Sequence, residues 1–137
     1  IVFAETGHLC IATLHSNNAN QALDRIINFF PEDRRSQLLL DLSLNLKAII
    51  AQQLIPRSDK KGLVPAVEIL LCTPAVRNIV REARSFEIPN VIETNRAMGM
   101  QSLDASIGEL YFNGMISRED AIAQAAYPEK LERQLAA

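Results

Sequence analysis

The chain's 137 residues are enough to form one domain with a buried core. Hydrophobic residues make up 48% and charged residues 22%, which is typical of globular proteins, and no uncharged stretch reaches the roughly 18 apolar residues that a membrane-spanning helix needs. With 14 Lys and Arg against 16 Asp and Glu, the net charge of -2 excludes an overall basic field that would attract nucleic acid.

The first residues predict that the chain continues a longer protein. There is no initiator methionine, and an apolar start leads to Gly7 as though a helix were already ending. We therefore expect the C-terminal part of something longer. The chain shows no signal peptide, and Cys10 and Cys72 both lie in apolar runs, where free cysteine behaves as a small buried hydrophobe. A reducing cytoplasm is the simplest location.

The two histidines, His8 and His15, stand at the two ends of one apolar run, Leu9 to Leu14. Such a run is typical of a parallel strand covered on both faces. Because ligands of open α/β sheets bind beyond the carboxyl ends of the strands, His15 and Ser16 stand where a ligand would lie. His15 could therefore touch a phosphate or position a water molecule.

A less specific interpretation stays open for both histidines. A histidine at a strand end is more often a satisfied polar residue than a catalytic one. His8 would lie about 20 Å from His15 along a fully extended strand, so the two cannot share a metal ion.

Capping residues and prolines along the chain predict where the next helices begin. Asn17 or Asn18 caps a helix that runs to about Asn28, with Gln21 as a capping-box partner of Asn18, and its free N–H groups could face an anion. Pro31, with acids after it, opens another helix.

The stretch that follows fits two patterns. Leu40, Leu42, Leu44 and Leu46 alternate as in a strand, whereas Leu39, Leu42, Leu46 and Ile49 form a helical stripe. We favour the helix, because Lys47 and Ala48 do not break it.

A β-hairpin and a series of helices complete the prediction. The hairpin strands run from about Ile50 to Pro56 and from Leu63 to Leu71. The predicted helices cover residues 75–84, 89–98 and 100–111, a segment capped by Ser117 with Asp120, and a frayed tail after Pro128.

Chemical motifs are incomplete in this sequence. HExxH and CxxC are absent, so zinc and hydrolase sites have little support, and no GxxxxGK[ST] phosphate loop is present. Judged by its chemical motifs alone, the chain holds only half of a functional site.

Three segments resemble one family in the order expected for it. ETGHLCIATLHSNNANQALDRIINFFP (5–31) is similar to the histidine box and following helix of the secretion and type IV pilus ATPases, in particular the pilus-retraction ATPases of twitching motility. AIIAQQLIP (48–56) with PAVEILLCTPAVRNIVRE (65–82) resembles the hairpin and helix that follow in that family. MGMQSLD (98–104) resembles its late helical segment.

The resemblance implies an α/β fold, the C-terminal part of a RecA-like P-loop ATPase core followed by a C-terminal helical bundle. Residues 1–72 would belong to the RecA-like domain and 73–137 to the helical subdomain. His15 and His8 match the catalytic histidines of the box, and Thr13 with His15 would contact the nucleotide. The phosphate loop and the catalytic glutamate precede the box in that family, so we expect this chain to be inactive alone.

The same resemblance implies a partner set and a location. The whole protein would be a hexameric, self-associating motor that hydrolyses ATP with Mg²⁺, both bound mainly by residues outside this chain. Its partners would be further copies, a paralogous retraction ATPase and the inner-membrane platform protein, and not nucleic acid. It would be cytoplasmic and peripheral at the inner membrane at the pilus base.

An eight-residue segment resembles the AIRNLIRE motif needed for retraction. Its residues are Ala75, Val76, Arg77, Asn78, Ile79, Val80, Arg81 and Glu82. On a helix, Arg77, Arg81 and Arg84 would share one face, where like charges cost a few tenths of a kcal/mol unless partners neutralise them. The alternative is a solvated face with Glu82 and Glu87 nearby. Val76, Ile79, Val80 and Ala83 would form the apolar face of the helix, and the resemblance favours an interaction surface on the arginine face.

Departures from the family pattern narrow the assignment. Cys10 and Cys72 cannot form the cysteine-rich zinc element common in secretion and pilus-extension relatives, which indicates the retraction side. NANQALDRIINFFPEDRR with LLLDLSLNLKA is more similar to the accessory retraction ATPase, and AVRNIVRE to the main one; we favour the accessory type. Gln53 stands where many relatives have arginine, which puts that arginine's role in doubt.

Two other classes of function remain open. One is a non-catalytic interaction module, in which the helices after Thr73 bind a partner of a pilus or secretion assembly. The other is a DNA-binding helical domain, since Gly99 and Gly114 join short helices at helix-turn-helix spacing. The acidic balance counts against DNA.

Overall fold

The computed structural model describes residues 2–136, and their side chains from Phe3 onward. An N-terminal helical part comes first, with α1 (Val2–Glu5), α2 (Ala19–Asn28) and α3 (Glu32–Asn45). A hairpin of β1 (Ala48–Pro56) and β2 (Leu63–Leu71) follows, and then α4 (Pro74–Arg81), α5 (Ile88–Thr94), α6 (Leu103–Phe112), α7 (Arg118–Gln124) and α8 (Pro128–Leu135). Short 3-10 helices, η1 (Ser85–Glu87) and η2 (Arg96–Met98), flank α5. None of these helices is long and apolar enough to cross a membrane.

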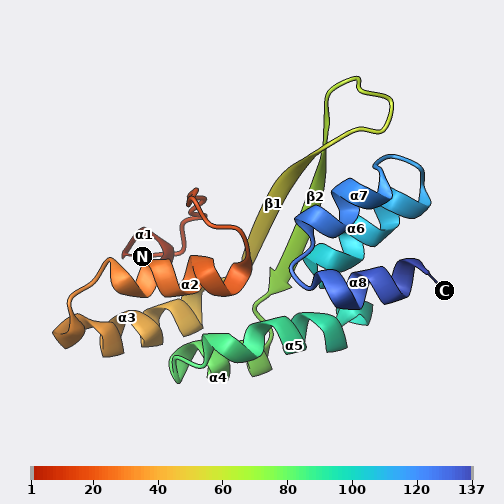
Figure 1. The fold of residues 1–137 in the computed structure, drawn as a ribbon. Helices are drawn as coiled ribbons and strands as arrows, with labels where there is room; N and C mark the ends of the chain where they lie inside the picture. Colours follow the sequence, from red (N-terminus) through yellow and green to blue (C-terminus); the bar gives the residue numbers. More distant parts are fainter. Residues whose placement is uncertain (1, 137) are drawn as a thin grey trace.

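Helices lie on two sides of the hairpin. Figure 1 shows α2 and α3 to one side of it and α6, α7 and α8 to the other, with α4 and α5 near the end of β2. The strands pair antiparallel over their full length, from Ala48 opposite Leu71 to Pro56 opposite Leu63. The predicted hairpin is confirmed, with its first strand starting two residues earlier than expected.

The predicted strand Leu9 to Leu14 is wrong. This segment has no regular secondary structure, and its apolar side chains face solvent, with Leu9 85% and Ile11 86% exposed. Cys10 is exposed too, so the expectation of a buried thiol fails there. A parallel strand needs neighbours on the same sheet. Within residues 2–136 the sheet consists of β1 and β2 alone, and neither pairs with this run.

Capping side chains begin three helices, and those of Asn18 and Ser117 were predicted. Asn18 accepts a hydrogen bond from the Gln21 amide and begins α2, while the Gln21 side chain returns to the Asn17 amide instead of to Asn18. Thr73 caps α4 and Ser117 caps α7.

The ambiguous leucine-rich segment is helical only as far as Asn45. Lys47 lies at the junction where the chain turns into β1, so the expectation that Lys47 and Ala48 continue the helix is wrong. The buried residues of α3 are Leu38, Leu42 and Ser43. The predicted stripe through Leu39 is therefore wrong except at Leu42. Pairing with β2 outweighs helical propensity here, because all nine residues of β1 gain a strand partner.

Several C-terminal helices are shorter than predicted. Helix α4 ends at Arg81, where Ala83 adopts a left-handed conformation (φ 54°). The second helix divides into α5 and η2, and Gly99 (φ 93°) ends it as expected. The tail forms α8, whose Leu131 is buried.

Two hydrophobic clusters form the core of the described residues. One joins α2 and α3 to α4 and α5, around Leu23, Leu42, Val80 and Ile92. The other joins the half of the hairpin nearer its turn to α6, α7 and α8, around Ile55, Ile107 and Leu131. Both clusters therefore combine residues from each side of position 72, and the division of the chain at residues 72 and 73 stays a prediction.

Candidate functional site

The predicted nucleotide contacts lie on the irregular segment before α2. His8, Thr13 and His15 are all exposed. The Thr6 hydroxyl lies 2.9 Å from His8 Nδ1, and the Phe3 ring packs edge-on against the imidazole. Among the hydrogen bonds of residues 2–136, none involves the His15 side chain. His15 therefore lies exposed on an irregular segment instead of at the end of a strand.

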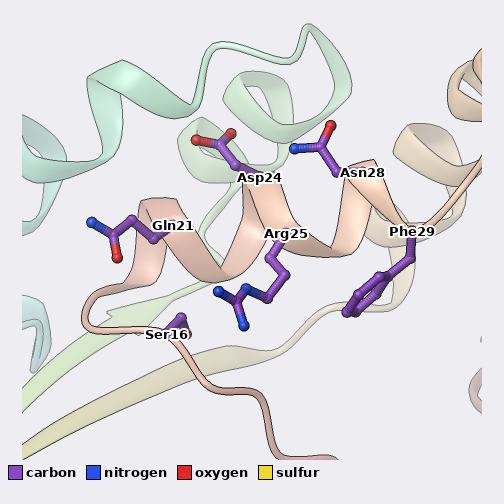
Figure 2. A pocket seen from close by; sticks show the side chains of 6 residues that line it. All are labelled: Ser16, Gln21, Asp24, Arg25, Asn28 and Phe29. Atoms are coloured by element: carbon purple, nitrogen blue, oxygen red, sulfur yellow. The ribbon is translucent and has the colours of Figure 1, made fainter.

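A surface hollow of about 490 Å³ lies beside this segment. Its lining comes from Ser16 and the exposed face of α2: Gln21, Asp24, Arg25, Asn28 and Phe29. Figure 2 shows the Arg25 side chain on the side of α2 that faces Ser16, with the Phe29 ring also there, while Asp24 and Asn28 project from the opposite side. Arg25 thus presents a positive charge on the side of α2 that faces Ser16, the residue after His15, and sequence reasoning had not singled Arg25 out.

The retraction-motif segment divides into a buried and an exposed half. Val76, Ile79 and Val80 are buried in the first cluster, and α4 packs against α3. Ala75, Asn78, Arg81 and Glu82 are exposed. The motif therefore supplies core packing with one side of its helix and offers the other to solvent.

The predicted arginine face is only partly correct. Arg84 lies beyond the end of α4 and forms ion pairs with Glu82 (2.8 Å) and Glu87 (2.6 Å), as the solvated-face alternative holds. Within the described chain neither Arg77 nor Arg81 forms a salt bridge. Arg81 donates instead to the Asn78 side chain at 3.3 Å. Ala83 is exposed and left-handed, so it does not extend the apolar side.

Cys72 sits where β2 leads into α4, and it is half-buried. Burial raises the pKa of its thiol to about 11, and the nearby positive charges of Arg77 and Lys47 oppose the shift only weakly. A thiol with this pKa stays protonated at neutral pH and is a poor nucleophile. Cys72 is therefore a packing residue, as predicted for it.

Two buried carboxylates escaped the sequence reasoning. Glu68 on β2 is 9% exposed, and its Oε1 accepts a hydrogen bond of 2.7 Å from the Ala19 amide. Asp104 on α6 accepts hydrogen bonds from the amides of Ala126 (2.7 Å) and Tyr127 (2.9 Å).

Burial raises the pKa of Glu68. Hydrogen bonds from the Ala19 and Leu103 amides oppose this shift, and the negative charge of Asp104 adds to it. The sequence held one signal of this buried carboxylate. Glu68 is the single charged residue in Leu63–Leu71, and it occupies one of the alternate positions that face inward.

Metal binding finds no support among the described residues. No group of three or more His, Cys, Asp or Glu side chains lies close enough together to hold an ion.

Comparison with known proteins gives this geometry a family. Residues 1–68 match the model of the type II/IV secretion system proteins. The chain is 52% identical over 125 residues to the type IV pilus ATPase PilU of Pseudomonas aeruginosa, covering 91% of this chain and 33% of PilU. It is 40% identical over 126 residues to the pilus retraction ATPase PilT of the same organism, covering 92% of this chain and 36% of PilT.

The crystal structure of the pilus retraction motor PilT with bound ADP superposes with a TM-score of 0.76 at 36% identity, covering 92% of this chain and 35% of that one. The chain belongs to the family of type IV pilus retraction ATPases. Its fold corresponds to a C-terminal part of the α/β ATPase fold of these proteins. The chain spans about a third of the length of the curated retraction ATPases that it matches.

Proposed function

We propose that the protein containing this chain is a hexameric motor that hydrolyses ATP to drive type IV pilus retraction and twitching motility. The likeness over nine tenths of the chain to PilU and PilT carries the proposal. The higher identity to PilU than to PilT favours a PilU-type motor.

Within this chain, we assign the nucleotide contacts to Thr13 and His15, with His8 as the second catalytic histidine. Their exposure and the absence of a hydrogen bond to the His15 ring leave them accessible to a ligand. A family structure holds ADP, which supports a nucleotide as that ligand. ATP and Mg²⁺ would be held mainly by residues outside this chain, because the sequence contains no GxxxxGK[ST] loop.

The exposed half of Ala75–Glu82 would contact a partner during retraction. Arg81, which is exposed and forms no ion pair within the described chain, supports this role. The partners would be neighbouring copies in the ring, a paralogous retraction ATPase and the membrane platform protein. With these partners, the motor would lie in the cytoplasm at the inner membrane.

His15→Ala in the full-length protein tests the assignment. We expect ATP turnover to fall by about a hundredfold, the range for removing a group that acts on the reacting atoms, and twitching to stop. The melting temperature and the ring size should not change, because His15 is exposed. Glu119→Ala, a change at an exposed residue of α7, is the control and should leave turnover at the wild-type level. Normal turnover in the His15 variant would contradict the assignment.

A further inference from the structure

Glu68 occupies an unusual place on β2. It faces the interior between Ala66, which belongs to one hydrophobic cluster, and Leu70, which belongs to the other. A buried carboxylate is costly unless hydrogen bonds compensate its lost hydration. The hydrogen-bond partners of Glu68 should therefore account for its buried position.

Two helices begin at this carboxylate. Ala19 is the first residue of α2 and donates its backbone N–H to Glu68 Oε1 at 2.7 Å. Leu103, the first residue of α6, lines the same small pocket as Glu68, and its backbone N–H favours the ionised carboxylate. The first N–H groups of a helix have no partner inside the helix and carry partial positive charge, so Glu68 pairs with the start of α2 and places its negative charge beside the start of α6.

Asp104 extends the same arrangement to a third helix. It follows Leu103 and accepts the amides of Ala126 and Tyr127, which lead into α8. The starts of α2, α6 and α8 are therefore connected through two neighbouring buried carboxylates.

The Ala19–Glu68 bond also stands apart in the hydrogen-bond pattern. Of the hydrogen bonds between residues 2 and 136, it alone joins the part of the chain before Lys47 to the part after it. His15 lies four residues before Ala19, on a segment without regular structure. The polar anchor nearest to His15 that reaches across the fold is thus Glu68.

We propose that Glu68 is a positioning residue, which holds the start of α2, and with it His15 and Ser16, at a set place relative to α6. This role rests on the proposed function of His15. Glu68 does not touch the nucleotide; it acts through the backbone of Ala19.

Glu68→Gln in the full-length protein is the principal test. The amide has the same shape but no charge, and only one of its two ends accepts hydrogen bonds, so the bond that holds the Ala19 amide weakens. We expect kcat for ATP to fall about tenfold, the lower range for losing a residue that orients a reacting group. KM should stay within about twofold, because ATP would be held mainly by residues outside this chain.

Ser106→Ala is the matched control. The Ser106 hydroxyl accepts the Val67 amide at 3.0 Å, so its removal also breaks a bond between β2 and α6 next to Glu68, but one that does not reach α2. We expect the control to lower the melting temperature and leave kcat unchanged. An equal loss of kcat in both variants would show a general effect of packing and overturn the proposal.

Hydrogen–deuterium exchange supplies a readout besides activity. In Glu68→Gln, peptides that contain His15 and Ala19 should take up deuterium faster than in the wild type, and in Ser106→Ala they should not. Faster exchange together with an unchanged kcat would make Glu68 merely structural. If Glu68→Gln does not fold, Glu68→Asp, which keeps the charge and withdraws the carboxylate by one methylene, takes its place with the same expected results.

The two proposals fail separately. If the wild-type protein hydrolyses no ATP, the proposed function fails, and the exchange comparison alone decides whether Glu68 holds the His15 segment. If the wild type is active and Glu68→Gln keeps both its kcat and its exchange rates, only the positioning role is overturned.

Discussion

At the residue scale, the end of α4 shows a helix terminus made with an unfavourable residue. The Ala83 amide donates to the Val80 carbonyl (3.1 Å) and the Arg84 amide to the Ile79 carbonyl (2.9 Å), which is the pattern of a Schellman motif. The residue at its left-handed position is normally glycine, yet here it is Ala83 with φ 54°. Its Cβ makes this conformation costly, by roughly 1–2 kcal/mol.

Ala83→Gly should therefore stabilise the protein. Relief of the left-handed strain outweighs the added freedom of glycine in the unfolded chain, and we expect the free energy of unfolding to rise by about 0.5–1 kcal/mol. Chemical denaturation of the purified protein measures it. Ala75→Gly, on the exposed first turn of the same helix, should lower the stability by about 0.5–1 kcal/mol. A loss of stability in both variants would contradict the strain at Ala83.

At the element scale, α4 combines a packing role with an exposed one. Its apolar side packs against α3 in the first cluster. The helix begins at Pro74, and the Thr73 hydroxyl caps its N-terminus. The Arg77 Nε is enclosed without a hydrogen-bond partner, while Arg81 is exposed. The two arginines of the motif are therefore in different environments, although the sequence placed them on one face.

Replacing Arg77 and Arg81 together by alanine tests the proposed contact surface. We expect the fold to survive with a change in stability of about 0.5 kcal/mol, as at ordinary surface positions. ATP affinity should also survive, whereas pilus retraction should fail. Melting temperature, nucleotide binding and twitching need to be measured on the same variant.

The single variants locate the effect within α4. If Arg81→Ala alone abolishes twitching and Arg77→Ala does not, the exposed residue makes the contact. Unchanged twitching in the double variant would make α4 an ordinary solvated helix. Unfolding of the double variant would make the arginines structural.

At the scale of the whole molecule, a large apolar surface is left without cover. The outward face of the hairpin carries Ile50, Leu54 and Leu63, which are 69%, 55% and 56% exposed. The segment Leu9 to Leu14 adds further exposed apolar side chains. Exposed apolar side chains gathered on one face of a hairpin are typical of a surface that another chain or segment covers.

The chain of residues 1–137 on its own should therefore self-associate. We expect sedimentation to show dimers or larger species and an apolar dye to bind, because burying the hairpin face gains about 25 cal/mol per Å² of apolar surface. The double variant Ile50→Thr and Leu54→Thr should reduce both signals. A stable monomer without dye binding would contradict this expectation. ATP turnover by the same sample would contradict a divided site.

Local chemistry was sufficient for much of the fold. Asn18, Thr73 and Ser117 begin helices because their side chains accept first-turn amides, and this bond needs only the next three residues. The second strand of the hairpin was predicted at its observed bounds, and Gly99 ends its helix because glycine adopts a positive φ freely. The resemblance of the histidine segment to the retraction ATPases was likewise visible in the residues alone.

Tertiary structure decided what depends on partners distant in the sequence. The apolar run Leu9 to Leu14 has the composition of a buried strand, yet it remains irregular among the described residues because neither hairpin strand pairs with it. Lys47 ends a helical pattern because β2 offers the following residues a strand partner. Glu68 holds the start of α2 only because the fold brings Ala19 beside β2, and a carboxylate's partner 49 residues away cannot be read from its neighbours along the chain.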